Sequence, residues 1–247
     1  GQPVETFSQL SQPCAAGPVC FERVIGCRMA EGVARTTTNA SKAWEDFRSS
    51  VVSKRCPEGQ GKRRAANGTI VVAFTIRGHS RNIRNLDSLL EACRGLGLLA
   101  GRPVECKSVK FKNILEDVCA VQDIDIMVGI HGAQLMNALL MRPGSSLLEI
   151  RANLWWEADE HGVLTNPSSW PNTLAQELWL TNNTRYFFYG ALQNESFPYK
   201  QSAVPGRDSD VEVSWPLLQC MLQRIATAGD QGGHPVRLNA GCSRAAA

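Results

Sequence analysis

The sequence predicts an α/β fold built on a doubly wound, mainly parallel β-sheet. From residue 69 onward, short apolar runs rich in β-branched residues alternate with segments of helical periodicity. The run TIVVAFTI at 69–76 is almost entirely apolar or β-branched, which is typical of a strand buried on both faces of a parallel sheet. The connections are short, which favours right-handed crossovers with helices on both faces of the sheet.

The expected elements follow one another without an internal repeat. A first helix is expected over 40–54, where Ala43, Phe47 and Val51 recur at helical spacing behind Ser41. The remaining elements are, in chain order, a strand at 69–76, a helix at 86–99, a strand at 102–111, a helix at 113–125, a strand at 126–130, a helix at 132–141, a strand at 145–150 and a helix at 215–229.

The two ends of the chain carry weaker signals. Residues 1–39 contain prolines and cysteines without a sustained period, so we expect an irregular lead-in there. Residues 229–247 are rich in glycine and alanine, so we expect a flexible tail and place the domain at 40–228. The segment after Arg151 contains Trp155, Trp156, Trp170, Trp179 and the aromatic run 186–189. These side chains either form a surface that stacks on sugars or pack in the core.

Composition excludes some classes of partner. The chain has 247 residues, of which 43% are hydrophobic and 20% charged, so it can bury a core. Its formal net charge of +3 is too small to require nucleic acid or an anionic membrane. No apolar run approaches the roughly 20 residues of a membrane-spanning helix. We therefore expect contact with a membrane only through a segment outside this chain.

Nine cysteines and four N-glycosylation sequons favour a secretory compartment. None of the cysteines forms the C-x-x-C pairs of a structural zinc site, so oxidised pairs are favoured. Burial as free thiols is an equal alternative for Cys93, Cys106 and Cys119, which fall in apolar segments. The sequons begin at Asn39, Asn67, Asn182 and Asn194.

Two of the predicted strands end in residues suited to an anion. Arg77 and Arg81 follow the first predicted strand. His131, Gly132 and Ala133 follow the third and open a helix. In a doubly wound sheet, ligands bind beyond the carboxyl ends of the strands, and a helix start beside guanidinium groups is suited to phosphate. The alternatives are a solvated arginine face, a buried structural histidine and small residues kept for close packing.

The sequence contains no other signature of a nucleotide or metal site. It has neither G-x-G-x-x-G nor G-x-x-x-x-G-K-[ST], so a dinucleotide fingerprint and a P-loop are not supported. Asp123 and Asp125 precede a strand, so we expect them in an exposed turn and not at a metal. We expect no cofactor and no requirement for a divalent metal.

Two stretches of the chain resemble the motifs of a known family. The stretch IRGHSRNIRN at 76–85 is similar to the pattern R-x-x-x-R-x-I-x-N. The stretch DIDIMVGIHGAQLMNALLMRPGSSLLEI at 123–150 is similar to G-x-H-G-A-x-L-x-N, followed by P-G and a strand that ends in Glu. The matching residues of the second motif are Gly129, His131, Gly132, Ala133, Leu135, Asn137, Pro143, Gly144 and Glu149. Both patterns belong to glycosyltransferase family 61, and the resemblance covers about residues 40–190.

This resemblance implies a GT-B architecture, in which two Rossmann-like domains bind the substrates and the C-terminal one holds the nucleotide sugar. The chain would contain that Rossmann-like domain, with residues 1–39 as the remnant of an incomplete N-terminal part. The implied reaction transfers a sugar from a UDP-sugar to a hydroxyl of a glycan or glycoprotein, with inversion, in the Golgi or endoplasmic reticulum lumen. The alternatives are a non-catalytic nucleotide-sugar-binding remnant and a structural Rossmann-like module.

The predicted roles of the site residues follow from the same resemblance. The predicted donor-binding residues are Arg77, Arg81, Asn85, His131, Gly132, Ala133, Asn137 and Glu149. The predicted catalytic residues are Arg81, which meets the departing diphosphate, and His131, which either donates to phosphate or acts as a weak base. The phosphate role is favoured for His131, and ribose binding is expected of Glu149. The sequence departs from the family pattern at Gln134, where a third small residue is common.

Overall fold

The computed structural model describes residues 37–56, 68–78, 80–112, 114–153, 184–198, 208–228 and Cys242. All of them belong to one compact unit, Thr37–Ala247. The lead-in predicted over 1–39 lies outside the described residues except for its last three, which begin a helix. The tail predicted over 229–247 lies outside them apart from Cys242.

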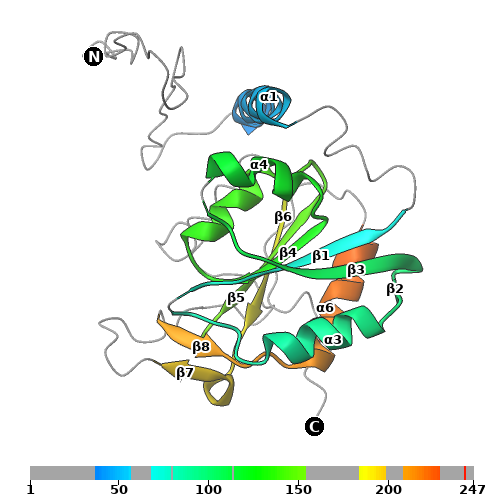
Figure 1. The fold of residues 1–247 in the computed structure, drawn as a ribbon, viewed down its shortest axis with the longest axis vertical. Coiled ribbons are helices and arrows are strands. Elements are labelled where there is room, and N and C mark those ends of the chain that lie inside the picture. Colours follow the sequence, from blue (N-terminus) through cyan, green and yellow to red (C-terminus); the bar gives the residue numbers. More distant parts are fainter. Residues whose placement is uncertain are drawn as a thin grey trace. The chain divides into compact units, whose positions relative to one another are not determined.

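A six-stranded, mainly parallel sheet forms the centre of this unit (Figure 1). Its strands are β1 (Ile70–Thr75), β2 (Leu98–Leu99), β3 (Arg102–Val109), β4 (Ile126–Ile130), β5 (Ser146–Arg151) and β6 (Arg185–Gly190). They lie in the order β2-β3-β1-β4-β5-β6, and all neighbours are parallel except β2 and β3. The predicted α/β class and mainly parallel sheet are therefore confirmed, and the arrangement is compatible with a Rossmann-like fold.

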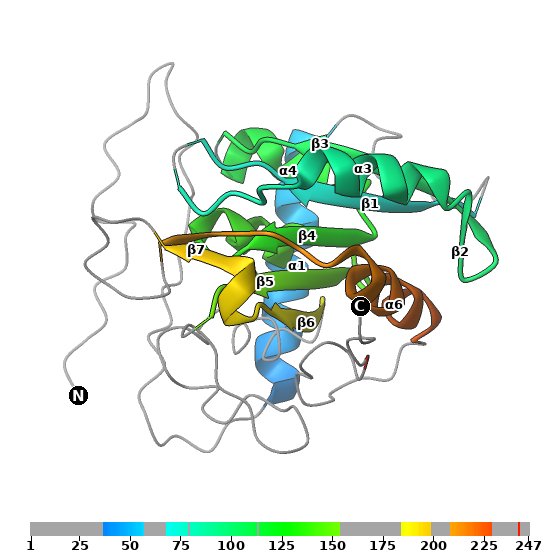
Figure 2. The same ribbon diagram turned by 90° about the horizontal axis from the view of Figure 1, so that it is seen from below.

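Helices cover both faces of the sheet (Figure 2). On one face lie α3 (Leu86–Gly95) and α6 (Trp215–Thr227). On the other lie α1 (Thr37–Arg55), α4 (Ile114–Gln122) and the 3₁₀ helix η2 (Ala133–Leu140). Within the described ranges, no helix is both long enough and apolar enough to cross a membrane.

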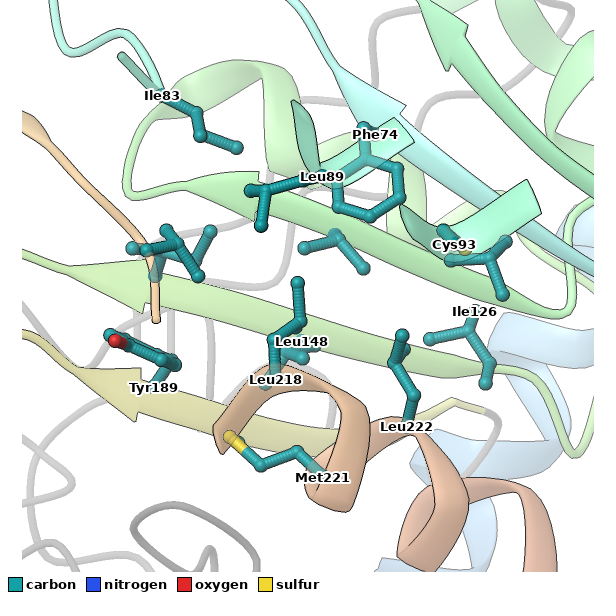
Figure 3. Close-up of a cluster of buried hydrophobic side chains, with 14 of the residues drawn as sticks. Phe74, Ile83, Leu89, Cys93, Ile126, Leu148, Tyr189, Leu218, Met221 and Leu222 are labelled. Carbon is teal, nitrogen blue, oxygen red and sulfur yellow. The ribbon is translucent and has the colours of Figure 1, made fainter. Parts of the chain in front are cut away.

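The core on the first face joins the two helices to the middle strands (Figure 3). Phe74 of β1, Leu148 of β5 and Leu218 of α6 have no exposed surface. The opposite side of the strands is equally apolar, and every residue of β4 is buried. A strand covered on both faces must be apolar along its whole length, which explains the continuous apolar runs in the sequence.

The order of the strands reverses between β1 and β4. From β1 the chain crosses to β3 on one side and then returns to β4 on the other. The loop after β1 leads to α3 on one face of the sheet, whereas the loop after β4 leads to η2 on the opposite face. α/β sheets bind their ligands beyond the carboxyl ends of the strands at such a reversal, and we call this region between β1 and β4 the crevice.

Several elements differ from those predicted. The helix predicted over 86–99 ends at Gly95, because Gly97 adopts a φ of +64° and turns the chain into β2. The segment predicted as a helix over 132–141 forms a 3₁₀ helix. The strand β6 was not among the predicted elements, although its aromatic run has high β propensity.

The aromatic residues after Arg151 divide into two groups. Tyr186, Phe188 and Tyr189 of β6 are buried, so the packing alternative holds for them. The four tryptophans at 155, 156, 170 and 179 lie outside the described residues.

A small hairpin follows the sheet and was also not predicted. The helical turn η4 (Gln193–Glu195) leads into β7 (Ser196–Pro198), which pairs with β8 (Ser209–Val211) in antiparallel fashion. Val211 also forms a parallel bridge with Ile83, in the loop after β1. The hairpin is therefore attached to the loop that carries the first family-like motif.

Asp125 lies in the interior and not in the exposed turn that we predicted. The residue is only 5% exposed, and both of its carboxylate oxygens accept hydrogen bonds. One accepts a hydrogen bond from the Val71 amide at 2.9 Å and the other from Arg142 Nη2 at 3.2 Å. The carboxylate thus joins β1, β4 and the turn before β5 at the amino end of the sheet.

The six cysteines within the described residues all form disulfides. Cys56–Cys119 joins α1 to α4 on one face, Cys93–Cys106 joins α3 to β3 on the other, and Cys220–Cys242 ties the end of the chain to α6. The oxidised-pair prediction is confirmed for these residues. The free-thiol alternative for Cys93, Cys106 and Cys119 is wrong.

These pairings lead to a direct chemical prediction. We expect proteolysis of the unreduced protein to release three linked peptide pairs, containing Cys56–Cys119, Cys93–Cys106 and Cys220–Cys242. Mass spectrometry before and after reduction measures them, and the linked masses should disappear on reduction. Alkylation of any of these six thiols in the unreduced, denatured protein would contradict the assignment.

Candidate functional site

The two family-like loops meet at the crevice between β1 and β4. Arg77 and Arg81 come from the loop after β1, and His131 is the first residue after β4. Nη1 of Arg77 and Nη1 of Arg81 both donate to the His131 carbonyl oxygen, at 3.1 and 3.0 Å. The structure therefore brings the predicted guanidinium groups together at the start of η2.

The hairpin holds the arginine loop in an uncommon conformation. Arg81 has a φ of +60°, in the left-handed region that non-glycine residues rarely adopt. The next residue is fixed on both sides: the Asn82 amide donates to Asp210 Oδ1 at 2.7 Å, and its carbonyl accepts from the Val211 amide at 2.9 Å. Backbone strain of this kind clusters at functional sites, where surrounding contacts maintain it.

Gly132 lets the arginines reach the start of the helix. A Cβ atom at this position would overlap Nη1 of Arg77. Any side chain at position 132 would therefore displace that guanidinium from the His131 carbonyl. This close approach explains why a glycine follows the histidine.

Positive charge dominates this part of the crevice. Burial lowers the pKa of Arg77, the neighbouring Arg81 charge lowers it further, and Asp208 opposes the shift. Arg81 Nε lies 3.5 Å from Asp208 Oδ1. Two half-buried cations that repel each other form a site at which an added anion is stabilised.

A buried hydrogen-bond network lies beneath His131. Nδ1 of His131 contacts Glu149 Oε1, and Glu149 Oε2 accepts from Arg151 Nη2 at 2.9 Å and from the hydroxyl of Tyr186. Burial would raise the pKa of Glu149, but Arg151, His131 and Tyr186 bring it down to about 2. The carboxylate is therefore ionised and fixes both the position of the imidazole and the nitrogen that donates to it.

Glu149 does not have the role that we predicted for it. Its side chain has no exposed surface, and its two oxygens are occupied by His131, Arg151 and Tyr186. It has no surface with which to meet a ribose hydroxyl. The structure instead makes it the support of His131.

The remaining predicted residues lie around the same two loops. Asn85 forms two hydrogen bonds with the backbone of Val213, at 2.9 and 3.0 Å, and so anchors the start of α3. Asn137 donates to the Gln134 carbonyl at 3.1 Å, which supports the turn. Ala133 is exposed at the start of η2, and donor binding at all these positions stays a prediction.

Gln134, which departs from the family pattern, is directed at the sheet. Its Nε2 donates to Thr75 Oγ1 at 3.1 Å, at the end of β1. This contact joins the start of η2 to the end of β1.

Four residues of the site were not predicted. Arg151 and Tyr186 belong to the buried network, while Asp208 and Asp210 come from the hairpin. Arg151 lies two residues after Glu149 on one strand, so alternation alone places both on the same face. The other three depend on strand pairings over long sequence distances. Within the described residues, no three His, Cys, Asp or Glu side chains cluster as a metal site would require.

Comparison with known proteins agrees with this geometry. Residues 29–148 match the family described as Glycosyltransferase 61, and the matched region includes Arg77, Arg81 and His131. No curated protein matches the sequence significantly. Residues 29–148 therefore support assignment of the chain to glycosyltransferase family 61, a family of enzymes.

Proposed function

We propose that this chain binds the diphosphate of a UDP-sugar at the crevice between β1 and β4 and transfers the sugar, with inversion, to a hydroxyl of a glycan or glycoprotein. The observation that carries the proposal is the convergence of Arg77 and Arg81 on the carbonyl of His131. A guanidinium group can bind two phosphate oxygens at once, and the start of a helix adds backbone amides that donate to phosphate.

The charges of Arg77 and Arg81 favour a diphosphate as the ligand. Arg77 and Arg81 lie close enough to lower the pKa of Arg77, with Asp208 as a neighbouring carboxylate. A diphosphate brings several negative charges, so it relieves this repulsion more fully than a neutral sugar or a single carboxylate does. The ligand would exchange the His131 carbonyl and Asp208 for phosphate oxygens as partners of the two side chains.

The same residues act on the transfer step. When the bond to the sugar breaks, negative charge accumulates on the departing diphosphate, and fixed cations stabilise that charge. Arg81 and Arg77 supply the cations. The proposed donation from His131 to phosphate comes from Nε2 and requires both ring nitrogens to carry hydrogen, because Nδ1 is bonded to Glu149. Because these side chains neutralise the leaving group, the proposed reaction needs no divalent metal.

The setting of this reaction is the lumen of the Golgi or endoplasmic reticulum. The family match, three disulfides and four sequons support this compartment. Asn194, which begins one sequon, is exposed in η4. In this proposal the site belongs to the C-terminal half of a GT-B enzyme, which holds the donor.

The test is calorimetric titration of UDP and several UDP-sugars into the purified chain, with and without manganese. We expect binding without manganese, and Arg81→Ala should weaken it about tenfold to a hundredfold, since one charge-assisted contact is lost. Donor hydrolysis or transfer should fall with it.

Arg102→Ala is the matched control. Arg102 also donates to a backbone carbonyl, that of Gly68 at 2.7 Å, but it lies at the amino end of β3, at the opposite edge of the sheet. Equal losses in the two variants would indicate a general effect of charge and contradict the site. UDP binding without transfer to any acceptor would favour the non-catalytic alternative, and no binding at all would favour a structural module.

A further inference from the structure

We propose that Arg151 and Tyr186 are positioning residues for His131, which they orient by locking the Glu149 carboxylate beneath it. The inference rests on the proposed function only where it predicts an effect on UDP binding. The hydrogen-bond arrangement itself can be tested without any ligand. Both residues lie beyond the region that matches the family.

The contacts divide the carboxylate into two halves. Oε2 of Glu149 accepts from Arg151 Nε at 3.0 Å, from Arg151 Nη2 at 2.9 Å and from the Tyr186 hydroxyl. Arg151 Nη2 also lies 2.9 Å from the Tyr186 oxygen, so the donors are held against each other. Oε1 is turned to His131 Nδ1. With one oxygen held by several donors, the carboxylate cannot rotate away from the imidazole.

Charge keeps each member of the network in one state. The Glu149 carboxylate is ionised, and the Arg151 guanidinium beside it balances its charge. Burial and the Glu149 charge raise the pKa of Tyr186 well above its usual value, so the phenol stays protonated and donates. The ionised Glu149 can only accept, which requires a hydrogen on Nδ1 of His131.

Location distinguishes this network from ordinary core packing. Arg151 and Glu149 have no exposed surface and Tyr186 is 8% exposed, whereas the His131 side chain is 13% exposed and lies at the crevice. Buried ion pairs stabilise a fold less than apolar side chains of equal volume do. A buried ionic network that ends on His131 is better explained by orientation of that ring.

The experiment uses the intact chain and its histidine resonances. The protein has four histidines, so the imidazole nitrogens can be assigned by NMR with a His131→Gln variant as reference. In the unmodified protein at neutral pH, we expect Nδ1 of His131 to carry hydrogen. An unprotonated Nδ1 would overturn the inference by itself, whatever the variants show.

Tyr186→Phe removes one donor and keeps the ring. We expect the His131 nitrogen shifts to move and the affinity for UDP to fall roughly threefold to tenfold. Arg151→Lys keeps the charge but not the two hydrogen bonds to Glu149 Oε2, so its His131 shifts and UDP affinity should lie between those of Arg151→Met and the unmodified protein. The matched control is Tyr189→Phe, because Tyr189 lies on the same strand, is equally buried and donates to Glu195 at 3.0 Å, away from His131.

The outcomes separate this inference from the proposed function. If the unmodified protein fails to bind UDP while Tyr186→Phe still shifts the His131 resonances, the donor site is wrong and the positioning role stands. If UDP binds but Tyr186→Phe changes the His131 nitrogen shifts and the UDP affinity no more than Tyr189→Phe does, the positioning role is wrong. If Tyr186→Phe does not fold, the protonation of Nδ1 in the unmodified protein decides.

Discussion

Replacement of Glu149 by glutamine is expected to lower the free energy of unfolding at pH 7 by about 3 kcal/mol or more. The substitution preserves the shape of the side chain but removes its charge. Arg151, which has no exposed surface, would then be a buried cation without the carboxylate that balances it. Urea unfolding followed by circular dichroism measures the loss. Glu105→Gln, the same change at an exposed position on β3, should stay within about 0.5 kcal/mol of the unmodified protein.

The loss of stability caused by Glu149→Gln should depend on pH between the folded and unfolded pKa values of Glu149. The folded protein holds the pKa of Glu149 at about 2, below the usual 4.5. A lowered pKa contributes stability that is complete above the unfolded value and is lost as the pH falls towards the folded value. The difference in the free energy of unfolding between Glu149→Gln and the unmodified protein should therefore decrease by about 3 kcal/mol as the pH falls from 5 to 2. A constant difference across this range would mean that folding does not lower the pKa of Glu149.

Gly129→Ala is expected to destabilise the protein by about 3 kcal/mol or more, the largest effect of any single added methyl group that we predict. Gly129 lies in the middle of the sheet on β4, and a Cβ atom there would overlap Thr75 Oγ1 and lie 2.7 Å from Leu135 Cδ2. Thr75 belongs to β1 and is 4% exposed, so it has little room to move. Thermal unfolding measures the loss.

Gly95→Ala is the matched control for this substitution. Gly95 is the last residue of α3, and a Cβ atom there would meet nothing within 4 Å. The change should be neutral or slightly stabilising, since alanine favours the helix. If Gly129→Ala unfolds at the same temperature as this control, the close packing of β1, β4 and η2 at the crevice would be contradicted.

The sequence predicts the individual helices and strands of this fold better than it predicts which of them lie next to one another. The strands β1 and β4 are readable because burial on both faces demands continuous apolar runs. Arg77 and His131 are likewise recognisable, since each follows such a run and carboxyl ends of parallel strands share one edge. Both predictions use only local patterns and one rule of topology.

The parts of the site that were missed depend on distant partners. Glu149 at the end of a strand looks like a ribose ligand until β6 places the Tyr186 hydroxyl against it, 37 residues further along the chain. Nothing near Asp210 in the sequence indicates that it binds Asn82, 128 residues away. The function of a polar residue therefore depended on strand order, which the periodicity of one segment does not encode.

The pairing of the hairpin with the arginine loop has a consequence for synthesis of the protein. The arginines leave the ribosome early, but the contacts that hold Asn82 in place come from Asp210 and Val211. A nascent chain that has emerged only as far as β5 lacks these contacts and also lacks Tyr186. The proposed anion site is therefore completed only when nearly the whole domain has been translated, and a chain arrested before that point is unable to assemble it.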